Sequence, residues 1–564
     1  MKNTLNKTTG RLLVCFYFCF FLLGSALPLI SAKVLNDHQW REDLRFLAEK
    51  VAYEHRNPFD HVSAEVFWKE VEKLDRQIPS LEDHEIIVGM ARLVSLIHDG
   101  HTRLTLPLDP EGTASQSHTQ TNAPEKALRF HILPLRLYLY SDGLHVQAAA
   151  PEFKDILGAR VIKAGNKKSD EAMEAVRPVV HYDSDMWFKL IAPSMLTIPE
   201  VLHAQNLCES KEEASFVFQT QTGQEIKYTL KALDSKTKIQ WISANQGSKN
   251  PLPLYLKNPE ENFWFEYLAD EKLMYVQVNS IQDKREETIA EFSQRLFESV
   301  NSCAVEKFVL DLRLNGGGNN YLNRPLVLSI IKSDKVNRYG KLFTIIGRRT
   351  FSAAMNLVSD IEKWTQVIFA GEPTGNAPSH YGDSRKFILP RSQLTARISS
   401  IHWRDWSVDE KRPWVAPDIK AALTSEEYAA NRDPVLDEII SYKAPETLYG
   451  QLNEKIEMSG IEAAVFHYYK FRYSPHTAQI KAEKDLIKVG DYLTGQGEFK
   501  EAGYIYLICT RDYPDSFKAH LGLGNIYINQ KNKKQAIEIL KKALRINPES
   551  REAKELMERA QALK

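Results

Sequence analysis

Residues 308–375 constrain the fold of this chain more than any other segment. Buried apolar runs alternate there with glycine turns. Phe308-Val-Leu-Asp-Leu leads into Asn315-Gly-Gly-Gly, Leu342-Phe-Thr-Ile-Ile leads into Arg349-Thr-Phe-Ser-Ala-Ala, and Val367-Ile-Phe-Ala leads into Gly371-Glu-Pro-Thr-Gly. Such runs, with amphipathic helices between them, are typical of an α/β core around a buried sheet. The segment therefore predicts parallel strands whose loops carry any reactive groups.

Ser352 is embedded where the second of these strands gives way to a helix. A serine at such a turn, close to free main-chain N–H groups of a glycine turn, supplies a nucleophile and an oxyanion pocket. Acyl transfer requires both, so the first hypothesis is a serine hydrolase. The alternative is that Ser352 only caps the helix that follows it, because serine is a preferred N-cap residue.

Length and charge exclude several classes of protein. The chain has 564 residues, of which 43% are hydrophobic and 26% charged, enough for about three to four globular units. Lysine plus arginine and aspartate plus glutamate both total 73. A balanced charge gives no overall attraction to nucleic acid or anionic lipid. We therefore expect no nucleic-acid partner and a specificity that comes from shaped clefts.

The first 32 residues have the order of an export signal. Basic residues precede the apolar run 12–23, and small residues end at Ala32. The run is too short for a convincing membrane span, and no later stretch reaches the roughly 20 apolar residues that a span needs. The prediction is an exported, soluble protein, periplasmic or extracellular. Lipid anchoring through Cys15 is the less favoured alternative, since the residues before it match a lipobox only faintly.

Composition and periodicity divide the chain into regions. Apolar residues at three- and four-residue steps predict helices before residue 105, and short alternating runs predict a β-rich module after it. The phrase Ile156-Leu-Gly-Ala-Arg-Val-Ile-Lys-Ala-Gly-Asn gives that module a resemblance to a degenerate PDZ domain. The predicted regions are a signal (1–32), a helical unit (33–106), a linker (107–127), the PDZ-like module (128–234), a linker (235–261), the α/β core (262–442) and helical repeats (443–564).

The C-terminal region repeats itself. Gly490, Ala502 and Pro514 each return 34 residues later, as Gly524, Ala536 and Pro548. This is the period of the tetratricopeptide repeat, a helical pair that stacks on its neighbours and leaves a concave surface. We expect the region to bind a protein partner or to cap the core.

Five phrases together resemble the tail-specific, or C-terminal-processing, serine peptidases and their tricorn and interphotoreceptor retinoid-binding protein relatives. They are Asp99-Gly-His-Thr, Asp311-Leu-Arg-Leu-Asn-Gly-Gly-Gly, Arg349-Thr-Phe-Ser-Ala-Ala, Gly371-Glu-Pro-Thr-Gly and Ala416-Pro-Asp-Ile, in family order. The resemblance covers about residues 38–442. It implies a ClpP/crotonase-like core, hydrolysis of polypeptide substrates, no cofactor, and Ser352 as the nucleophile. The oxyanion would be held by the N–H of Ala353 and by that of Gly317 or Gly318.

The sequence departs from the family at the base. Processing peptidases pair the serine with a lysine about twenty-five residues downstream, but residues 376–380 read Asn-Ala-Pro-Ser-His. Histidine is the natural substitute, because its ordinary pKa lies near neutrality. His101 resembles the position from which tricorn-type relatives recruit their base, and we favour it over His380. Glu410 or Asp409 could orient the base, because tricorn-like members take a glutamate from this region.

Two other functions were weighed against hydrolysis. His98 and His101 form a short His-x-x-His, but without His-Glu-x-x-His, a cysteine pair or an acidic cluster the sequence predicts no metal site. A catalytically inactive protein that binds peptides or apolar ligands on the same fold is the stronger rival. Against it, an abandoned oxyanion pocket has no structural need for so many glycines.

Overall fold

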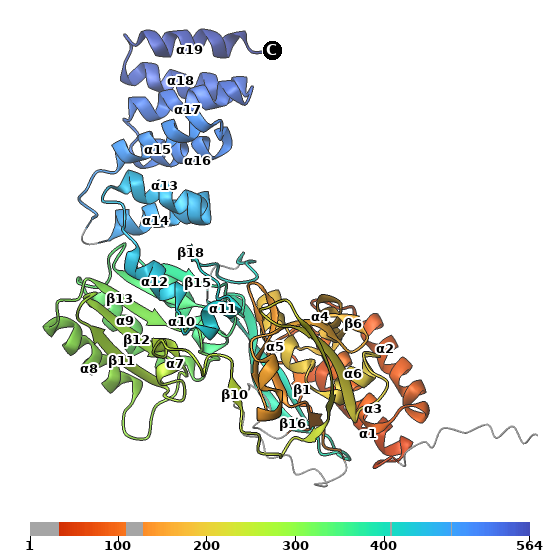
Figure 1. The fold of residues 1–564 in the computed structure, drawn as a ribbon. Helices are drawn as coiled ribbons and strands as arrows, with labels where there is room; N and C mark the ends of the chain where they lie inside the picture. Colours follow the sequence, from red (N-terminus) through yellow and green to blue (C-terminus); the bar gives the residue numbers. More distant parts are fainter. Residues whose placement is uncertain (1–32, 109–127, 406–408, 475–476) are drawn as a thin grey trace, which may run out of the picture.

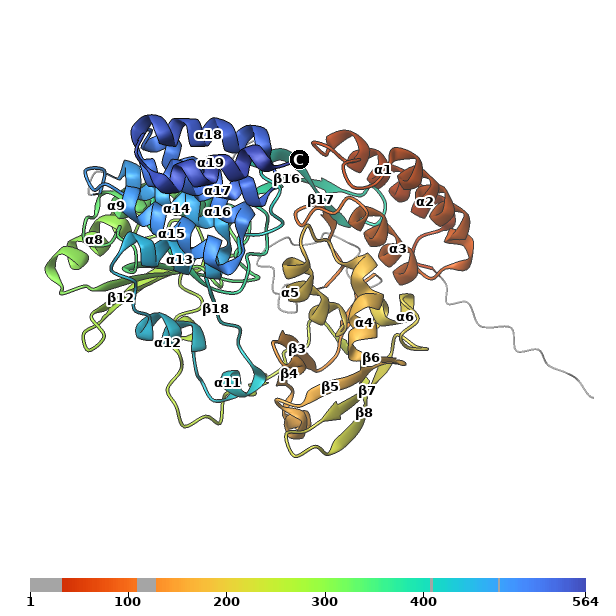
Figure 2. The ribbon, with the colours of Figure 1, turned by 90° about the horizontal axis from the view of Figure 1, so that it is seen from above.

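The computed structural model describes residues 33–108, 128–405, 409–474 and 477–564 (Figure 1). The predicted export signal and most of the predicted linker 107–127 lie outside the described residues. Two lobes lie side by side, and the C-terminal helices are stacked on one of them (Figures 1 and 2). Within the described ranges, no helix is both long and apolar enough to cross a membrane.

Helices form the N-terminal unit, as its periodicity predicts. Asn36 and Ser63 begin the first two by accepting hydrogen bonds from the backbone N–H groups three residues further on. The apolar faces of all three helices are buried. The helices are α1 (Asp37–Glu54), α2 (Ala64–Gln77) and α3 (Asp83–Ser95), and the short strand β1 (Arg103–Leu104) follows them.

The next region is the expected β-rich module. Its main strands run in the spatial order β10-β4-β5-β7-β8; in addition, β3 pairs with β4 and β6 pairs with β5. The last strand, β10, falls in the predicted linker 235–261 but pairs with β4. The strands are β2 (His131–Ile132), β3 (Leu135–Tyr140), β4 (Gly143–Ala149), β5 (Arg160–Ala164), β6 (Lys167–Lys168), β7 (Glu213–Gln219), β8 (Glu225–Lys231), β9 (Leu233–Asp234) and β10 (Ile242–Ser243). The helices are α4 (Ser169–Val176), α5 (Asp185–Met195), α6 (Pro199–Ala204) and α7 (Leu254–Lys257).

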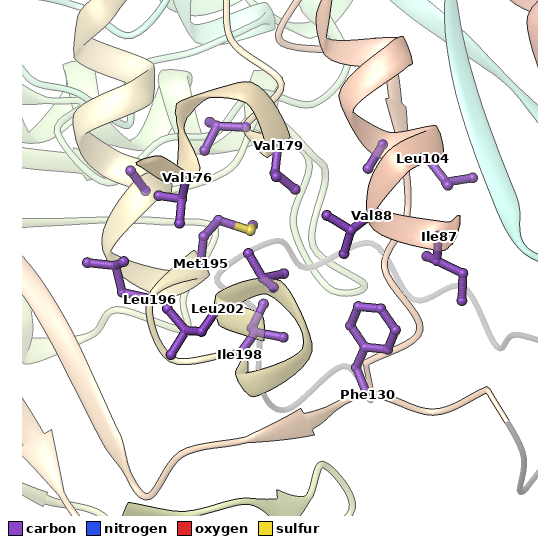
Figure 3. Packing of buried hydrophobic residues seen from close by; sticks show 14 of the residues in the cluster. Ile87, Val88, Leu104, Phe130, Val176, Val179, Met195, Leu196, Ile198 and Leu202 are labelled. Atoms are coloured by element: carbon purple, nitrogen blue, oxygen red, sulfur yellow. The ribbon is translucent and has the colours of Figure 1, made fainter. Parts of the chain in front are cut away.

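The helical unit and the β-rich module share one hydrophobic core. Ile87 and Val88 of α3 belong to the same buried cluster as Phe130, Val176 and Leu202 (Figure 3). This continuity makes the two regions one lobe.

A hairpin from the α/β core crosses to that lobe, which the sequence did not predict. Strands β16 (Ser379–Ile388) and β17 (Thr395–Arg404) pair with each other, and β17 pairs with β1. Leu394, Ala396 and Ile398 are buried in the N-terminal cluster rather than against the core sheet. The hairpin therefore connects the two lobes.

The core sheet has the order β11-β12-β13-β14-β15-β18 and is parallel from β12 onward. All six residues of β12 are buried, as expected for a sheet covered on both faces. The helix that follows β12 begins at Ile289, because Thr288 and Glu291 form a capping box. The strands are β11 (Phe263–Leu268), β12 (Leu273–Val278), β13 (Lys307–Asp311), β14 (Leu342–Ile346), β15 (Ile368–Gly371) and β18 (Ile419–Lys420). The helices are α8 (Ile289–Ser302), α9 (Arg324–Lys332), α10 (Ala353–Trp364), α11 (Ser425–Ala429) and α12 (Pro434–Ser441).

The C-terminal helices stack in pairs with the predicted period. A Cβ atom at Gly490 would lie 2.6 Å from the ring of Tyr506, and one at Gly524 would lie 2.5 Å from Leu540. These two close approaches are 34 residues apart. In each repeat, a glycine in the first helix therefore allows a side chain of the second helix to pack closely against it. The helices are α13 (Leu448–Ser459), α14 (Ile461–Tyr473), α15 (Glu483–Gln496), α16 (Phe499–Asp512), α17 (Phe517–Asn529), α18 (Lys533–Ile546) and α19 (Arg551–Ala562).

Candidate active site

Ser352 lies in the turn between β14 and α10, with φ 57° and ψ −127°. A non-glycine residue in this region of backbone space is strained, and such strain gathers at functional sites. Its side chain makes no capping hydrogen bond to α10. The hydroxyl is therefore not committed to capping the helix, which was the alternative reading of this serine.

The glycine turn after β13 faces Ser352. Gly317 has φ 110° and Gly318 has φ 140°, values that favour glycine. A Cβ atom at Gly317 would lie 2.7 Å from the Cβ of Ser352 and 3.2 Å from the N of Ala353. The absence of a side chain at Gly317 thus leaves space directly in front of the serine and the first amide of α10.

Main-chain N–H groups around this space differ in availability. The N–H of Gly317 donates to Oδ1 of Asn315 over 2.9 Å. Within the described residues, the N–H groups of Gly318 and Ala353 have no hydrogen-bond acceptor. Of the expected oxyanion donors, Gly318 and Ala353 are therefore the two that could receive a negative oxygen.

Buried ion pairs hold the glycine turn in place. Nε of Arg313 lies 2.8 Å from the carboxylate of Asp311, and its Nη1 lies 2.8 Å from that of Asp433 on α12. Asn315 also donates its side-chain amide to the carbonyl of Val278 at 2.9 Å. The turn is fixed from β12, β13 and α12, which is the preorganisation that an oxyanion site needs.

Ser352 opens into a cavity of about 540 Å³ where the two lobes meet. Gly317, Gly318 and Ser352 line it from the core, and His101 lines it from the N-terminal lobe. Apolar side chains of α5, namely Leu190, Ile191 and Met195, complete one part of the lining. Four of the residues predicted for the site thus meet in one cavity.

His101 has the position of a base whose lone pair is free. Its ring stacks on that of Phe351, the residue that precedes Ser352, and the two ring centroids lie 4.4 Å apart. Both ring nitrogens are buried, and neither makes a hydrogen bond of good geometry within the described residues, although the backbone of Tyr381 is near enough to act on the pKa of the ring. Burial lowers the pKa of His101 to about 3, although Asp99 acts to raise it. The imidazole is accordingly neutral at pH 7 and able to accept a proton.

Asp99 anchors the loop that carries His101. Its carboxylate accepts a hydrogen bond from the backbone N–H of His101 at 2.9 Å and lies 3.9 Å from Nδ1 of that ring. His55 contacts the other carboxylate oxygen at 3.2 Å. Burial alone would raise the pKa of Asp99, but the hydrogen bond from His55 holds it below its ordinary value. Asp99 is a positioning residue that the sequence pattern contained but that we did not single out.

His380 lies behind His101 rather than in the cavity. The two rings are nearly parallel, with centroids 6.0 Å apart, and His380 is not among the described residues that line the cavity. Its Nδ1 lies 3.0 Å from the carbonyl oxygen of Ala377, so that nitrogen carries the proton and donates it. Burial lowers the pKa of His380 as well. His101 therefore shares a cavity with Ser352, whereas His380 is not among the described residues that line it.

Glu410 and Asp409 lie elsewhere. Glu410 accepts a hydrogen bond from Arg412 at 2.8 Å, and Arg412 also binds Glu362 of α10 at 2.8 Å. Glu410 and Asp409 line a separate cavity between the core and the first repeat helices, together with Lys470. The structure does not bring either acid to the cavity of Ser352, so a role in orienting the base remains only a prediction.

Two residues that sequence reasoning missed hold the serine from behind. Oδ1 of Asn376 accepts a hydrogen bond from the backbone N–H of Ser352 at 2.6 Å. The side-chain amide of Asn376 donates to Asp183, whose other carboxylate oxygen is buried without a partner among the described residues. Burial, and then the charge of Asp99, raise the pKa of Asp183 well above its ordinary value. Asn376 is the first residue of the stretch 376–380, where processing peptidases have their lysine. That position was the signal in the sequence that could have identified Asn376 as a site residue.

The described residues contain no group of three or more histidine, cysteine, aspartate or glutamate side chains that could hold a metal ion. Within the part of the chain that the structure describes, the cysteines are Cys208, Cys303 and Cys509, and all are free thiols.

Comparison with known proteins supports the fold. A family model of the tetratricopeptide repeat matches residues 517–550. Among solved structures, mature CPAF matches with a TM-score of 0.50 and 11% identity, over 73% of this chain and 99% of that chain. The photosystem II D1 C-terminal processing protease matches with a TM-score of 0.34 and 13% identity, over 73% and 96%. The tricorn protease matches with 0.34 and 12%, over 72% and 36%.

A search of curated proteins gave no match to this sequence. At 11% identity, the match with mature CPAF shows a shared fold and nothing about chemistry. The expected mixed α/β fold and the expected tetratricopeptide region are thus confirmed: this chain combines the fold of mature CPAF with a C-terminal tetratricopeptide repeat.

Proposed function

We propose that this protein is a serine peptidase that cleaves polypeptides through an acyl-enzyme. One observation carries the proposal: the strained Ser352 faces a side-chain-free space at Gly317, next to the unoccupied N–H of Ala353. A tetrahedral oxyanion formed at the serine fits that space. Strain at the nucleophile and preorganised amide donors are what acyl transfer requires and what a helix cap does not.

In the first step, the Oγ of Ser352 attacks the carbonyl carbon of the scissile peptide. The carbonyl oxygen becomes negatively charged and is stabilised by the N–H groups of Ala353 and Gly318. Asn376 fixes the backbone of Ser352 through its N–H, so the hydroxyl is presented at a constant angle. Collapse of the tetrahedral intermediate releases the amine half of the substrate.

His101 is the proposed general base. Neutral at pH 7, it accepts the hydroxyl proton as Ser352 attacks and returns it to the leaving amine. Asp99, 3.9 Å from Nδ1, favours a proton on that nitrogen and leaves Nε2 as the acceptor. A water molecule, activated by the same imidazole, then hydrolyses the acyl-enzyme. The missing lysine of the processing peptidases is thereby replaced by a histidine from the other lobe.

The remaining predictions of partner and location are also proposals. The C-terminal helices would bind a protein partner on their concave surface, as tetratricopeptide repeats do. The signal-like segment 1–32 would direct the protein to the periplasm or the exterior of the cell. Three free cysteines, with no disulfide among the described residues, place no constraint on that location.

An activity-based probe separates the peptidase from an inactive binding protein. The purified protein is incubated with a fluorescent fluorophosphonate and, separately, with fluorogenic casein. We expect wild type to be labelled and to hydrolyse casein, and Ser352→Ala to do neither. Ser384 lines the same cavity, so Ser384→Ala is the matched control and should retain both activities. Failure of wild type to react in either assay would favour the inactive binding protein.

A further inference from the structure

The cavity at Ser352 is strongly basic. Arg103, Arg349 and Arg397 line it, whereas no aspartate or glutamate is among its described lining residues. The chain as a whole has balanced charge, so this concentration is local. A desolvated basic cavity attracts an anionic group more strongly than an exposed patch of the same charge.

Two of these arginines oppose each other directly. Arg103 of β1 and Arg397 of β17 are Cα partners in an antiparallel pair, and Lys386 of β16 is the next partner of Arg397. Residues directly opposite each other on neighbouring strands place their side chains on the same face of the sheet. Like charges in this arrangement destabilise a sheet unless something lies between them. Among the described residues neither arginine is in an ion pair with an acidic side chain, although the charge of Asp99 acts to raise the pKa of Arg103.

Two buried donors without an acceptor belong to residues that line this cavity. Nε of Arg397 and Nε1 of Trp187 are buried and have no acceptor among the described residues. Both residues line the cavity of Ser352. A buried N–H without an acceptor costs free energy, and a ligand oxygen would remove that cost. Burial, and then the charge of Arg397, lower the pKa of Arg103 to about 10, so both guanidinium groups remain charged at pH 7.

We propose that Arg103 and Arg397 form a subsite that binds a carboxylate of the polypeptide substrate beside the scissile bond. This inference rests on the proposed peptidase function and names its substrate class. The carboxylate is that of a glutamate or aspartate side chain of the substrate. Two guanidinium groups on one sheet face can together bind both oxygens of a carboxylate.

Matched peptides test the subsite. Quenched-fluorescent peptides with an amidated C-terminus differ only in glutamate or glutamine, placed in turn at each position around the cleaved bond. A third peptide has glutamine throughout and a free C-terminal carboxylate. At one position we expect kcat/KM to be about 10- to 100-fold higher for the charged peptide, the gain typical of hydrogen bonds to charged groups. The third peptide shows whether a terminal carboxylate serves equally well.

Variants assign the preference to the arginine pair. Arg397→Gln and Arg103→Gln should each abolish the preference for charge while the melting temperature stays equal or rises, because repulsion between the two is relieved. Arg385→Gln is the matched control: it lies on the same hairpin, its side chain is 65% exposed, and it pairs with Glu54. This variant should keep the preference. A falling melting temperature in both cavity variants, with the preference intact, would assign the arginines a structural role and overturn the proposal.

Binding to Ser352→Ala separates this inference from the proposed function. The anisotropy of a labelled glutamate peptide, compared with its glutamine twin, reports the subsite without chemistry. Charge-dependent binding without fluorophosphonate labelling of wild type would refute the peptidase and retain the subsite. Labelling of wild type without any difference between charged and neutral peptides would retain the peptidase and refute the subsite.

Discussion

Replacing Gly317 by alanine is predicted to abolish activity, whereas the same change at Gly316 is predicted to be nearly silent. A Cβ atom at Gly317 would lie 2.7 Å from the Cβ of Ser352 and 3.2 Å from the N of Ala353. Carbon atoms normally approach to about 3.5–4.0 Å, so the new methyl group is about 1 Å too close. It would occupy the space that the proposed account gives to the oxyanion.

The magnitude follows from two costs. An alanine at φ 110° is strained, at about 1–3 kcal/mol, which lowers the stability of the turn. The methyl group would also keep the oxyanion away from the N–H of Ala353. Loss of one oxyanion donor costs about 100- to 1,000-fold in rate, or about 3–4 kcal/mol of the activation barrier. At Gly316 the nearest atom to a new Cβ, Nε of Arg349, is 3.9 Å away, and φ is not positive. Neither cost applies there.

The assay measures the rate of fluorophosphonate labelling and the melting temperature of both variants. We expect labelling of Gly317→Ala to be at least 100-fold slower than that of wild type under conditions where the protein remains folded. Gly316→Ala should label within about twofold of wild type. Wild-type labelling of Gly317→Ala, or an equal loss at Gly316, would refute the assignment of this space to the oxyanion.

Three further predictions concern pH and the repeats. Because the pKa of His101 is lowered to about 3, the labelling rate should stay level from pH 8 to pH 5 and fall only below that; an acid limb near 6.5 would argue against His101 as the base. Burial also lowers the pKa of His181 to about 3. The contribution of this neutral imidazole to the free energy of unfolding is therefore complete above pH 6.5 and is lost as the pH falls below that value, by about 1.4 kcal/mol per pH unit. His181→Gln should reduce the slope of the unfolding free energy against pH, and an unchanged slope would contradict the burial of His181 as a neutral group. Gly490→Ala would place a methyl group 2.6 Å from Tyr506 and should lower the melting temperature of the repeat region. Gly495→Ala, whose new Cβ has no neighbour within 4 Å, should raise that melting temperature slightly. The opposite order of melting temperatures in calorimetry would refute the packing of the repeats.

Local patterns explain why much of the core could be predicted. The apolar run that begins at Phe308 is in β13 (Lys307–Asp311), and the run that begins at Leu342 is β14 (Leu342–Ile346). Continuous apolar runs and capping residues are properties of short segments, so a sequence displays them directly. The hairpin of β16 and β17 could not be placed this way, because its partner β1 lies about 290 residues earlier. Nothing local indicates which of two sheets a strand will join.

The site divides in the same way. Ser352 and the glycine turn belong to adjacent strands of one sheet, so their proximity follows from the order of the strands. His101 comes from the other lobe, and only its resemblance to a family phrase suggested it. Asn376 was overlooked because a proton acceptor was sought, whereas this residue holds a backbone N–H. Glu410 is the reverse case, a residue that was expected at the site and lies outside it. Its place in the sequence suggested the site, but its hydrogen bond with Arg412 holds it at another cavity.

The most direct test of the account is to find which residue the fluorophosphonate modifies. The labelled protein is digested, and the modified peptide is sequenced by mass spectrometry. The account predicts one adduct, on Ser352, whose formation is lost in Gly317→Ala and slowed in His101→Ala. A stoichiometric adduct on any other residue, with Ser352 unmodified, would contradict the central claim.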